Sequence, residues 1–187
     1  MSPRFTIADT PLAGVKVLTR APFGDARGFL DRLYDFDELR TLLGGKRIAQ
    51  VNHTATRDRG VVRGMHFQPP PFAETKLVSC IHGEVFDVAV DLRRGSPTFL
   101  RWHAERLSAD NKRTLLIPEG CAHGLQTLTT DCELIYAHTA PYAAEAEGGV
   151  NPRDPKLAIA WPQPITQMST RDESHAMITA AFEGIAL

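Results

Sequence analysis

Short apolar runs alternate with turn-forming residues along most of the chain. Segments such as KLVSCIHG (76–83) and EVFDVAVDL (84–92) are rich in strand-forming side chains and are bounded by Gly, Pro, Asn or Asp. The pattern predicts strands at 15–19, 29–34, 47–53, 61–67, 76–83, 84–92, 99–107, 113–118, 122–129 and 133–140. Because the strands are short and helical periodicity is scarce, the sequence predicts an all-β sandwich or barrel.

Helical signals are confined to two short stretches. In DFDELRTLL, Asp35 is placed as an N-cap and Glu38 follows three residues later, as in a capping box. A second short helix is expected near SHAMITAAF, close to the C-terminus. The irregular segment 141–155 is long enough to be a functional loop and could form a lid.

The segment 84–92 alternates in a way that leaves two interpretations open. Phe86, Val88 and Val90 share one face, whereas Asp87 and Asp91 share the other with small residues. The acidic face either lines a polar cavity or is solvated on the outside of the molecule, and alternation alone does not decide between them.

Composition favours one ordinary globular domain spanning residues 1–187. The chain is 43% hydrophobic and 23% charged, and its net charge is −1, so it lacks the basic surface that binds a nucleic acid polymer. No apolar run has signal-peptide character or membrane length, so no membrane association is expected and the cytoplasm is the expected location. Cys80, Cys121 and Cys132 are widely spaced without a CxxC pair, which predicts buried free thiols.

The stretch GVVRGMHFQPPP contains the histidine on which the chemistry depends. A metal-binding β-barrel of the cupin kind would carry a His-x-His pair here, but the chain reads His66-Phe67-Gln68, and Gln is a poor transition-metal ligand. Nucleophile elbows and phosphate loops are absent too. An enzyme of this sequence would therefore rely on acid–base groups, with His66 as the base and Asp87, Asp91 or Asp172 as its partner. A single histidine is nevertheless more often structural.

Six ordered segments carry a resemblance to a known family. They are DARGFLDRLY, QVNHTAT, GVVRGMHFQPPPFAETKLVSCIHGEVFDVAVDLRRGSPTF, LSADNKRTLLIPEGCAHGLQTL, LIYAHTAPYAAEAEGGV and STRD. Together these resemble the motifs of the dTDP-4-dehydrorhamnose 3,5-epimerases over nearly the whole chain, from Val15 to Asp172.

The resemblance implies a cupin-type jelly roll with a few short peripheral helices and an active site without metal or organic cofactor. It also implies a homodimer in which an N-terminal strand crosses to the partner. The implied substrate is dTDP-4-dehydro-6-deoxy-D-glucose, inverted at C3 and C5. A mono-epimerase acting at only one of these carbons, for natural-product deoxysugar synthesis, is the alternative; a metal-dependent cupin enzyme and a catalytically silent binding module are further rivals.

The resemblance also assigns roles to individual residues. It implies His66 as the base, Asp172 as its partner, Lys76 near the developing enolate oxygen and Tyr136 as the acid on the other face of the sugar. The implied contacts to nucleotide, diphosphate and sugar come from Arg27, Phe29, Asp31, Gln50, Asn52, Arg63, His123, Tyr142, Glu147 and Arg171. The sequence departs from the family pattern at Asp31, Ala137, Pro152 and Arg171.

Overall fold

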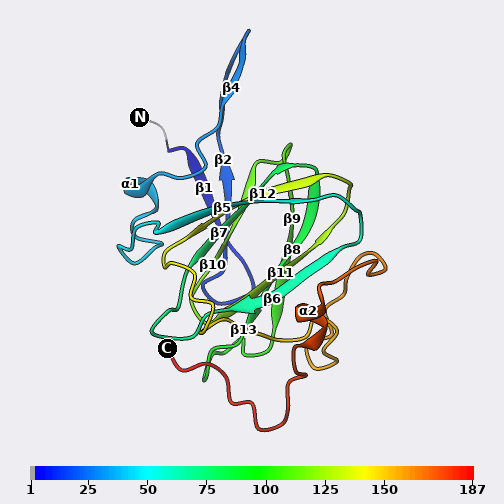
Figure 1. Ribbon diagram of the computed structural model, residues 1–187. Coiled ribbons are helices and arrows are strands. Elements are labelled where there is room, and N and C mark those ends of the chain that lie inside the picture. The colour runs from blue at the N-terminus through cyan, green and yellow to red at the C-terminus, as the bar shows by residue number, and fades with distance from the viewer. Residues whose placement is uncertain (1–2) are drawn as a thin grey trace.

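The strands form two antiparallel sheets that face each other (Figure 1). The computed structural model describes residues 3–187. One sheet has the order β1 (Phe5–Asp9), β2 (Lys16–Arg20), β10 (Arg113–Ile117), β7 (Lys76–His82), β12 (Cys132–His138) and β5 (Gln50–Thr56). The other has the order β13 (Gly148–Gly149), β6 (Val62–Phe67), β11 (Cys121–Thr127), β8 (Glu84–Asp91) and β9 (Trp102–Ser108).

Consecutive strands pass repeatedly between the two sheets. The chain runs from β6 to β7 in the opposite sheet, returns to β8, crosses again to β10 and comes back to β11. This is the connectivity of a jelly roll, so the expected all-β, cupin-type fold is confirmed. Two short helices, α1 (Phe36–Leu39) and α2 (Thr170–Ser174), lie outside the sheets.

Both faces of β8 are buried, so the face that carries Asp87 and Asp91 is not exposed to solvent. Val85 and Ala89 pack in the core between the sheets, whereas Val88 and Val90 pack in a second cluster with residues of the C-terminal segment. Asp87 shares the inner face and is fully buried. The solvated interpretation of that face is therefore wrong.

Most strand predictions agree with the structure to within a few residues, and the exceptions lie in the N-terminal part of the chain and at the two-residue β13. The segment 29–34 contributes only to a small hairpin of β3 (Phe23–Asp25) and β4 (Gly28–Leu30), and β1 was not expected. Asp35 caps α1 as expected, by accepting from the backbone N–H groups of Asp37 and Glu38.

The helix expected near SHAMITAAF is a misassignment. The structure has one helical turn earlier, at Thr170–Ser174, and residues 175–187 run irregularly across the second core cluster. The apolar residues Ile178 and Ile185 are buried there without helical backbone. Cys80, Cys121 and Cys132 are buried and free, as predicted. Among residues 3–187, no helix is both long and apolar enough to span a membrane.

Candidate active site

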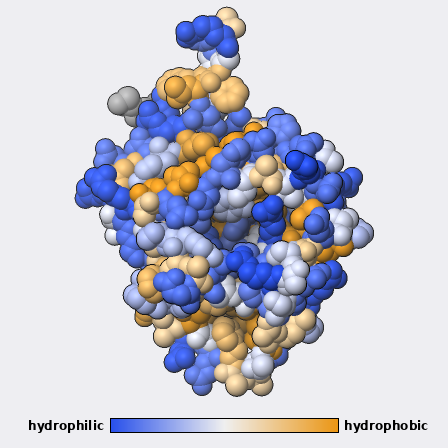
Figure 2. Space-filling view, in the orientation of Figure 1, coloured by the Kyte–Doolittle hydropathy of each residue, from blue (hydrophilic) through white to orange (hydrophobic). Residues whose placement is uncertain are grey.

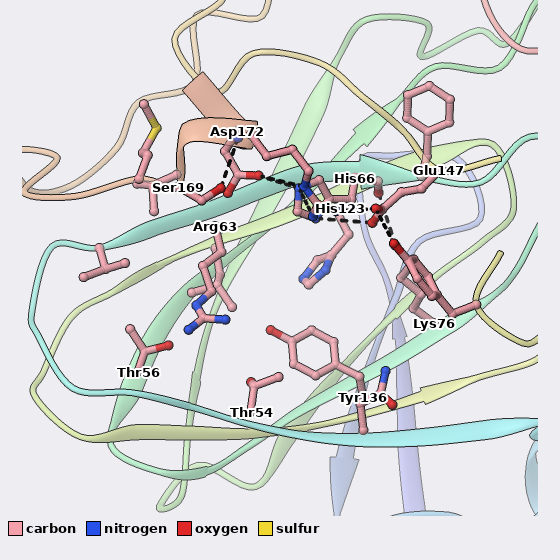
Figure 3. Close-up of a pocket in the computed structure, with 18 of the residues that line it drawn as sticks. Thr54, Thr56, Arg63, His66, Lys76, His123, Tyr136, Glu147, Ser169 and Asp172 are labelled. Carbon is pink, nitrogen blue, oxygen red and sulfur yellow. Dashed lines mark hydrogen bonds and ion pairs between the residues drawn. The ribbon is translucent and has the colours of Figure 1, made fainter. Parts of the chain in front are cut away.

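A cavity of about 950 Å³ opens between the two sheets, a size typical of sites for drug-sized ligands. It appears as a largely hydrophilic hollow on the face shown in Figure 2. The five-stranded sheet contributes Arg63, His66 and His123 to its wall, and the six-stranded sheet contributes Lys76 and Tyr136. Polar groups from two opposed walls therefore converge on one space (Figure 3).

His66 and Asp172 form a direct pair of ionisable groups beside the wall that the five-stranded sheet provides. The Nε2 atom of His66 lies 2.7 Å from Oδ1 of Asp172, and the second carboxylate oxygen accepts from the backbone N–H of Gly64 at 3.2 Å. Because a carboxylate only accepts, Nε2 carries the hydrogen in this contact and Nδ1 is left as the basic nitrogen. Of the three acids that the sequence offered as partners for His66, Asp172 is the one in contact.

The start of α2 fixes the Asp172 carboxylate. Ser169 is the N-cap of this helix, and its hydroxyl oxygen accepts from the backbone N–H of Asp172 at 3.1 Å. The Asp172 side chain is 3% exposed. Burial alone would raise the pKa of Asp172, but the hydrogen bond and charge of His66 outweigh burial and lower it. The carboxylate therefore remains ionised next to the histidine at neutral pH.

An irregularity in β6 places both Arg63 and His66 along the cavity. Residues three apart on a regular strand point to opposite faces. Here the register with β11 shifts between His123 and Leu125, opposite Gly64, whose φ is +123°. A Cβ atom on Gly64 would lie 2.5 Å from Cα of Gly124, so the close approach of the two strands requires glycine at this position.

Glu147 and Arg171 border the His66–Asp172 pair. Arg171 Nη1 lies 2.5 Å from Oε2 of Glu147, and its Nη2 lies 3.1 Å from Nε2 of His66. The Tyr142 hydroxyl donates to the same Glu147 oxygen at 3.0 Å. Tyr142 and Glu147 belong to the loop 141–155, so this loop does border the cavity, as expected of a functional loop.

Lys76 and Tyr136 lie on the six-stranded sheet and face His66 and the other residues of the five-stranded sheet across the cavity (Figure 3). The Lys76 ammonium donates to the backbone oxygen of His66 at 3.2 Å, which links the two walls. Burial raises the pKa of Tyr136, and the charge of Asp87 adds to the shift. Tyr136 therefore holds its proton at neutral pH, as an acid must.

A second His–Asp pair lies deeper in the same site. His123 Nε2 lies 2.8 Å from Oδ1 of Asp87, and the His123 ring packs edge-on against Tyr136 with centroids 5.6 Å apart. Burial raises the pKa of Asp87, although the charges of His123 and Lys76 act in the opposite direction. Asp91 lies elsewhere and binds Arg93.

Two polar residues of the site, Gln50 and Gln68, also bind the loop 141–155. Gln50 accepts from the Tyr142 backbone N–H at 2.9 Å and donates to Asn52 at 3.0 Å. Gln68, which stands where a metal-binding cupin would have its second histidine, accepts from the backbone N–H of Ala143 at 2.7 Å and is 3% exposed. It ties the loop 141–155 to β6.

Three residues expected to contact substrate lie outside the cavity of a single chain. Arg27 and Phe29 are on the projecting β3–β4 hairpin, where both are exposed. Asp31 instead pairs with the buried guanidinium of Arg20 at 2.9 Å. The cavity also contains two residues that sequence reasoning missed, Glu74 and His138, which lie beside Lys76. Glu74 was visible two residues before Lys76, but nothing in the sequence distinguished it from a surface acid.

One group of three possible metal-binding side chains occurs among residues 3–187. The donor atoms of His66, Asp172 and His175 lie within 4.8 Å of one another. His66 and Asp172 are hydrogen-bonded directly to each other, however, and the His175 ring packs against the backbone of Gly149. Burial and the charge of His66 lower the pKa of His175.

Comparisons with known proteins agree with this geometry. The family model of dTDP-4-dehydrorhamnose 3,5-epimerase matches residues 9–180. The dTDP-4-dehydrorhamnose 3,5-epimerase of Salmonella typhimurium is 40% identical over 94% of this chain and 97% of its own. The dTDP-4-dehydrorhamnose 3-epimerase of Streptomyces niveus is 37% identical over 91% of this chain and 82% of its own.

A solved structure shows the same fold. The dTDP-6-deoxy-D-glucose-3,5-epimerase of Legionella pneumophila, in complex with dTDP-4-keto-L-rhamnose, superposes with a TM-score of 0.87 at 38% identity and covers 92% of both chains. The chain belongs to the dTDP-4-dehydrorhamnose 3,5-epimerase family and is an isomerase.

Proposed function

We propose that this enzyme converts dTDP-4-dehydro-6-deoxy-D-glucose to dTDP-4-dehydro-L-rhamnose by inverting C3 and C5. The observation that carries the proposal is the opposition of two proton-transfer groups across one cavity. The His66–Asp172 pair belongs to one sheet and its flanking helix, and the protonated Tyr136 belongs to the other sheet. Inversion at carbon requires a base on one face of the sugar and an acid on the opposite face.

His66 removes the proton next to the ketone. Both C3 and C5 flank the C4 carbonyl, so loss of either proton gives an enolate with its charge largely on O4. Asp172 holds the Nε2–H of His66, and it stabilises the imidazolium that forms when Nδ1 takes the proton. A positioned base of this kind typically contributes about 10²- to 10⁴-fold in rate.

Lys76 stabilises the oxygen of the enolate. Its side chain is 8% exposed, and its ammonium is already fixed to the backbone of His66. A preorganised positive charge in a site shielded from water is worth more at a developing oxyanion than the same charge in solvent. Tyr136 then donates its proton to the carbon from the opposite face. Both transfers move a proton at a carbon that the neighbouring ketone already makes acidic, so the proposed chemistry does not require a redox cofactor.

The nucleotide part of the substrate requires cations and a stacking surface. Arg63 lines the cavity, and within residues 3–187 its one hydrogen bond goes to the backbone oxygen of Ala55 at 3.3 Å, so its guanidinium has N–H groups left for phosphate oxygens. His123, Gln50 and Asn52 line the same cavity and are proposed to contact the substrate. Arg171 is bound to Glu147 and would have to exchange that partner to reach a phosphate.

We also propose that the enzyme is a homodimer in which the N-terminal region of one protomer reaches its partner. The hairpin that carries Arg27 and Phe29 projects from the body, and its side chains Phe23, Phe29 and Leu30 are more than half exposed. A second copy would cover this apolar surface and bring Arg27 and Phe29 to a substrate cavity. Light scattering of the purified protein at micromolar concentration tests this, and a monomeric mass contradicts it.

The function is tested by incubating the enzyme with dTDP-4-dehydro-6-deoxy-D-glucose in deuterium oxide and following the C3 and C5 protons by NMR. Loss of both signals above the enzyme-free rate supports inversion at both carbons. Loss of one supports the mono-epimerase, which the similarity to a Streptomyces niveus 3-epimerase makes the second candidate. Loss of neither refutes the proposed reaction, and stoichiometric iron, manganese or zinc in active protein would favour a metal-dependent cupin reaction instead.

A further inference from the structure

Two buried polar side chains of the cavity have no part in the chemistry proposed above. Glu74 and His138 line the cavity, and their side chains are 8% and 12% exposed. Burying a carboxylate is costly unless it is paired. The buried Glu74 carboxylate is therefore expected to pair with a cationic side chain of the cavity.

The backbone brings both side chains to Lys76. His138 is the register partner of Lys76 in the pairing of β12 with β7. The pairing continues one residue beyond β7, because the backbone N–H of Thr139 donates to the Thr75 oxygen at 3.1 Å and the Thr75 N–H donates to the Thr139 hydroxyl at 2.8 Å. Glu74, two residues before Lys76 in this extended segment, lies on the same side as Lys76.

The contacts form a chain from Lys76 to His138. The Lys76 ammonium lies 3.3 Å from Oε1 of Glu74, and Oε2 of Glu74 lies 2.7 Å from Nδ1 of His138. The ammonium also donates to the backbone oxygen of His66. Since an ammonium has three N–H bonds in a tetrahedral arrangement, two fixed partners set the direction of the third.

We infer that Glu74 is a positioning residue for Lys76, and that His138 holds the Glu74 carboxylate in the orientation this requires. The inference rests on the proposed function, because it assigns to Lys76 the stabilisation of the enolate oxygen. Glu74 acts in two ways. It fixes the direction in which the ammonium presents its free N–H, and its negative charge pairs with that of a mostly buried lysine.

Other ionisable groups act on Lys76 less directly. Asp87 on β8 feels the charge of Lys76, but it is fully buried and hydrogen-bonded to His123. His66 on β6 offers Lys76 its backbone oxygen rather than its ring. Within residues 3–187, Glu74 is the acid that forms an ion pair with Lys76.

The state of Glu74 agrees with this role. Burial alone would raise the pKa of Glu74, but the hydrogen bond from His138 and the charge of Lys76 lower it. The carboxylate is therefore ionised at neutral pH. His138 in turn donates through Nδ1 and presents Nε2 to the Asn52 amide, 3.4 Å away.

The test compares kcat, KM and their pH dependence in Glu74→Ala and Glu74→Gln. In Glu74→Ala the freed lysine samples several rotamers, so kcat falls about tenfold, the equivalent of about 1.4 kcal/mol, while KM changes little. In Glu74→Gln the amide oxygen still accepts from Lys76, so kcat at neutral pH stays closer to that of the wild type. In both variants the alkaline loss of kcat begins about one pH unit lower, because the anion is gone.

Glu105→Gln is the matched control. Glu105 also joins a histidine and a cation, with His103 and Arg113 each 3.0 Å away, and it lies on β9 outside the cavity. This variant keeps the wild-type pH profile. A Glu74→Ala enzyme with wild-type kcat, KM and pH profile would overturn the inference. So would a uniform loss of activity with an unchanged pH profile, because that indicates a purely structural effect.

An NMR titration of lysine side chains labelled with ¹⁵N separates this inference from the proposed function. The Lys76 signal is identified by its absence in Lys76→Met. In Glu74→Gln this signal should titrate at lower pH than in the wild type, and titration at the same pH overturns the inference even if the wild type is active. An inactive wild type in the deuterium exchange refutes the proposed function and leaves this titration as the test of the ion pair.

Discussion

Replacing Asp172 with asparagine removes the charge beside His66 and keeps the shape of the side chain. The wild-type carboxylate accepts from His66 at 2.7 Å and from the Gly64 backbone at 3.2 Å, and it is almost fully buried. In Asp172→Asn the amide can offer its NH₂ group to His66. That arrangement favours the tautomer with the hydrogen on Nδ1, which leaves Nδ1 unable to accept a proton.

The expected loss follows from the hydrogen bond and the charge. A hydrogen bond to a charged group is worth about 1.5–3 kcal/mol. Two unit charges about 4 Å apart interact by about 4 kcal/mol at an effective dielectric constant of about 20, which sets an upper bound. Since about 1.4 kcal/mol corresponds to a factor of ten in rate, kcat should fall roughly 10- to 1,000-fold. KM should change much less, because the charge matters most when the imidazolium forms.

The assay is the initial rate of epimerisation at saturating substrate, with the melting temperature measured for each variant. Asp91→Asn is the control, because Asp91 is equally buried but binds Arg93, Ser96 and Thr98 away from the cavity. The control should lose stability and keep kcat. If Asp172→Asn kept kcat within about threefold of the wild type, Asp172 would not be the partner that supports the base.

Three other changes test different parts of the account. Tyr136→Phe should abolish inversion but retain exchange of the substrate protons with solvent, because His66 still forms the enolate; equal loss of both activities would contradict a separate acid. Gly149→Ala should lower the melting temperature and kcat, because the new Cβ would lie 2.2 Å from the His175 ring beside His66, and a second change, His175→Ala, should restore much of the stability. The pKa of Asp91 is lowered to about 2: burial opposes this shift, but the hydrogen bonds from Arg93, Ser96 and Thr98 outweigh it. A carboxyl group whose pKa is lower in the folded state stabilises the fold at pH values above its ordinary pKa, and this stabilisation is lost as the pH falls towards the lowered pKa. The free energy of unfolding of the wild type, measured in urea, should therefore fall by about 2 kcal/mol between about pH 4 and pH 2. Asp91→Asn should show a smaller decline over that window, and an unchanged decline would contradict the assignment.

The fold could be predicted from the sequence because its strands carry local signals. The runs at 61–67, 76–83 and 84–92 became β6, β7 and β8 with changes of only a residue or two at their ends. The C-terminal segment misled the prediction because Ile178 and Ile185 are buried by packing against the sheet rather than by helix formation. Such packing is a tertiary effect that local periodicity cannot report.

The site was predicted in part, and the missing parts have identifiable causes. His66 and Asp172 are 106 residues apart, so their contact followed from resemblance rather than from any local pattern. Regular alternation would have separated Arg63 from His66, but the close approach of Gly64 and Gly124 breaks the register between β6 and β11. Glu74 was overlooked because its importance comes from His138 and Lys76 across a strand pairing.

His66 is proposed as the base for both inversions, and deuterium exchange in His66→Ala measures that role without any other step. The variant is incubated with dTDP-4-dehydro-6-deoxy-D-glucose in deuterium oxide, and the C3 and C5 protons are followed by NMR beside the wild type and an enzyme-free sample. We predict that a folded His66→Ala protein leaves both protons at the enzyme-free rate. Exchange at either carbon at the wild-type rate would contradict the assignment of His66 as the base.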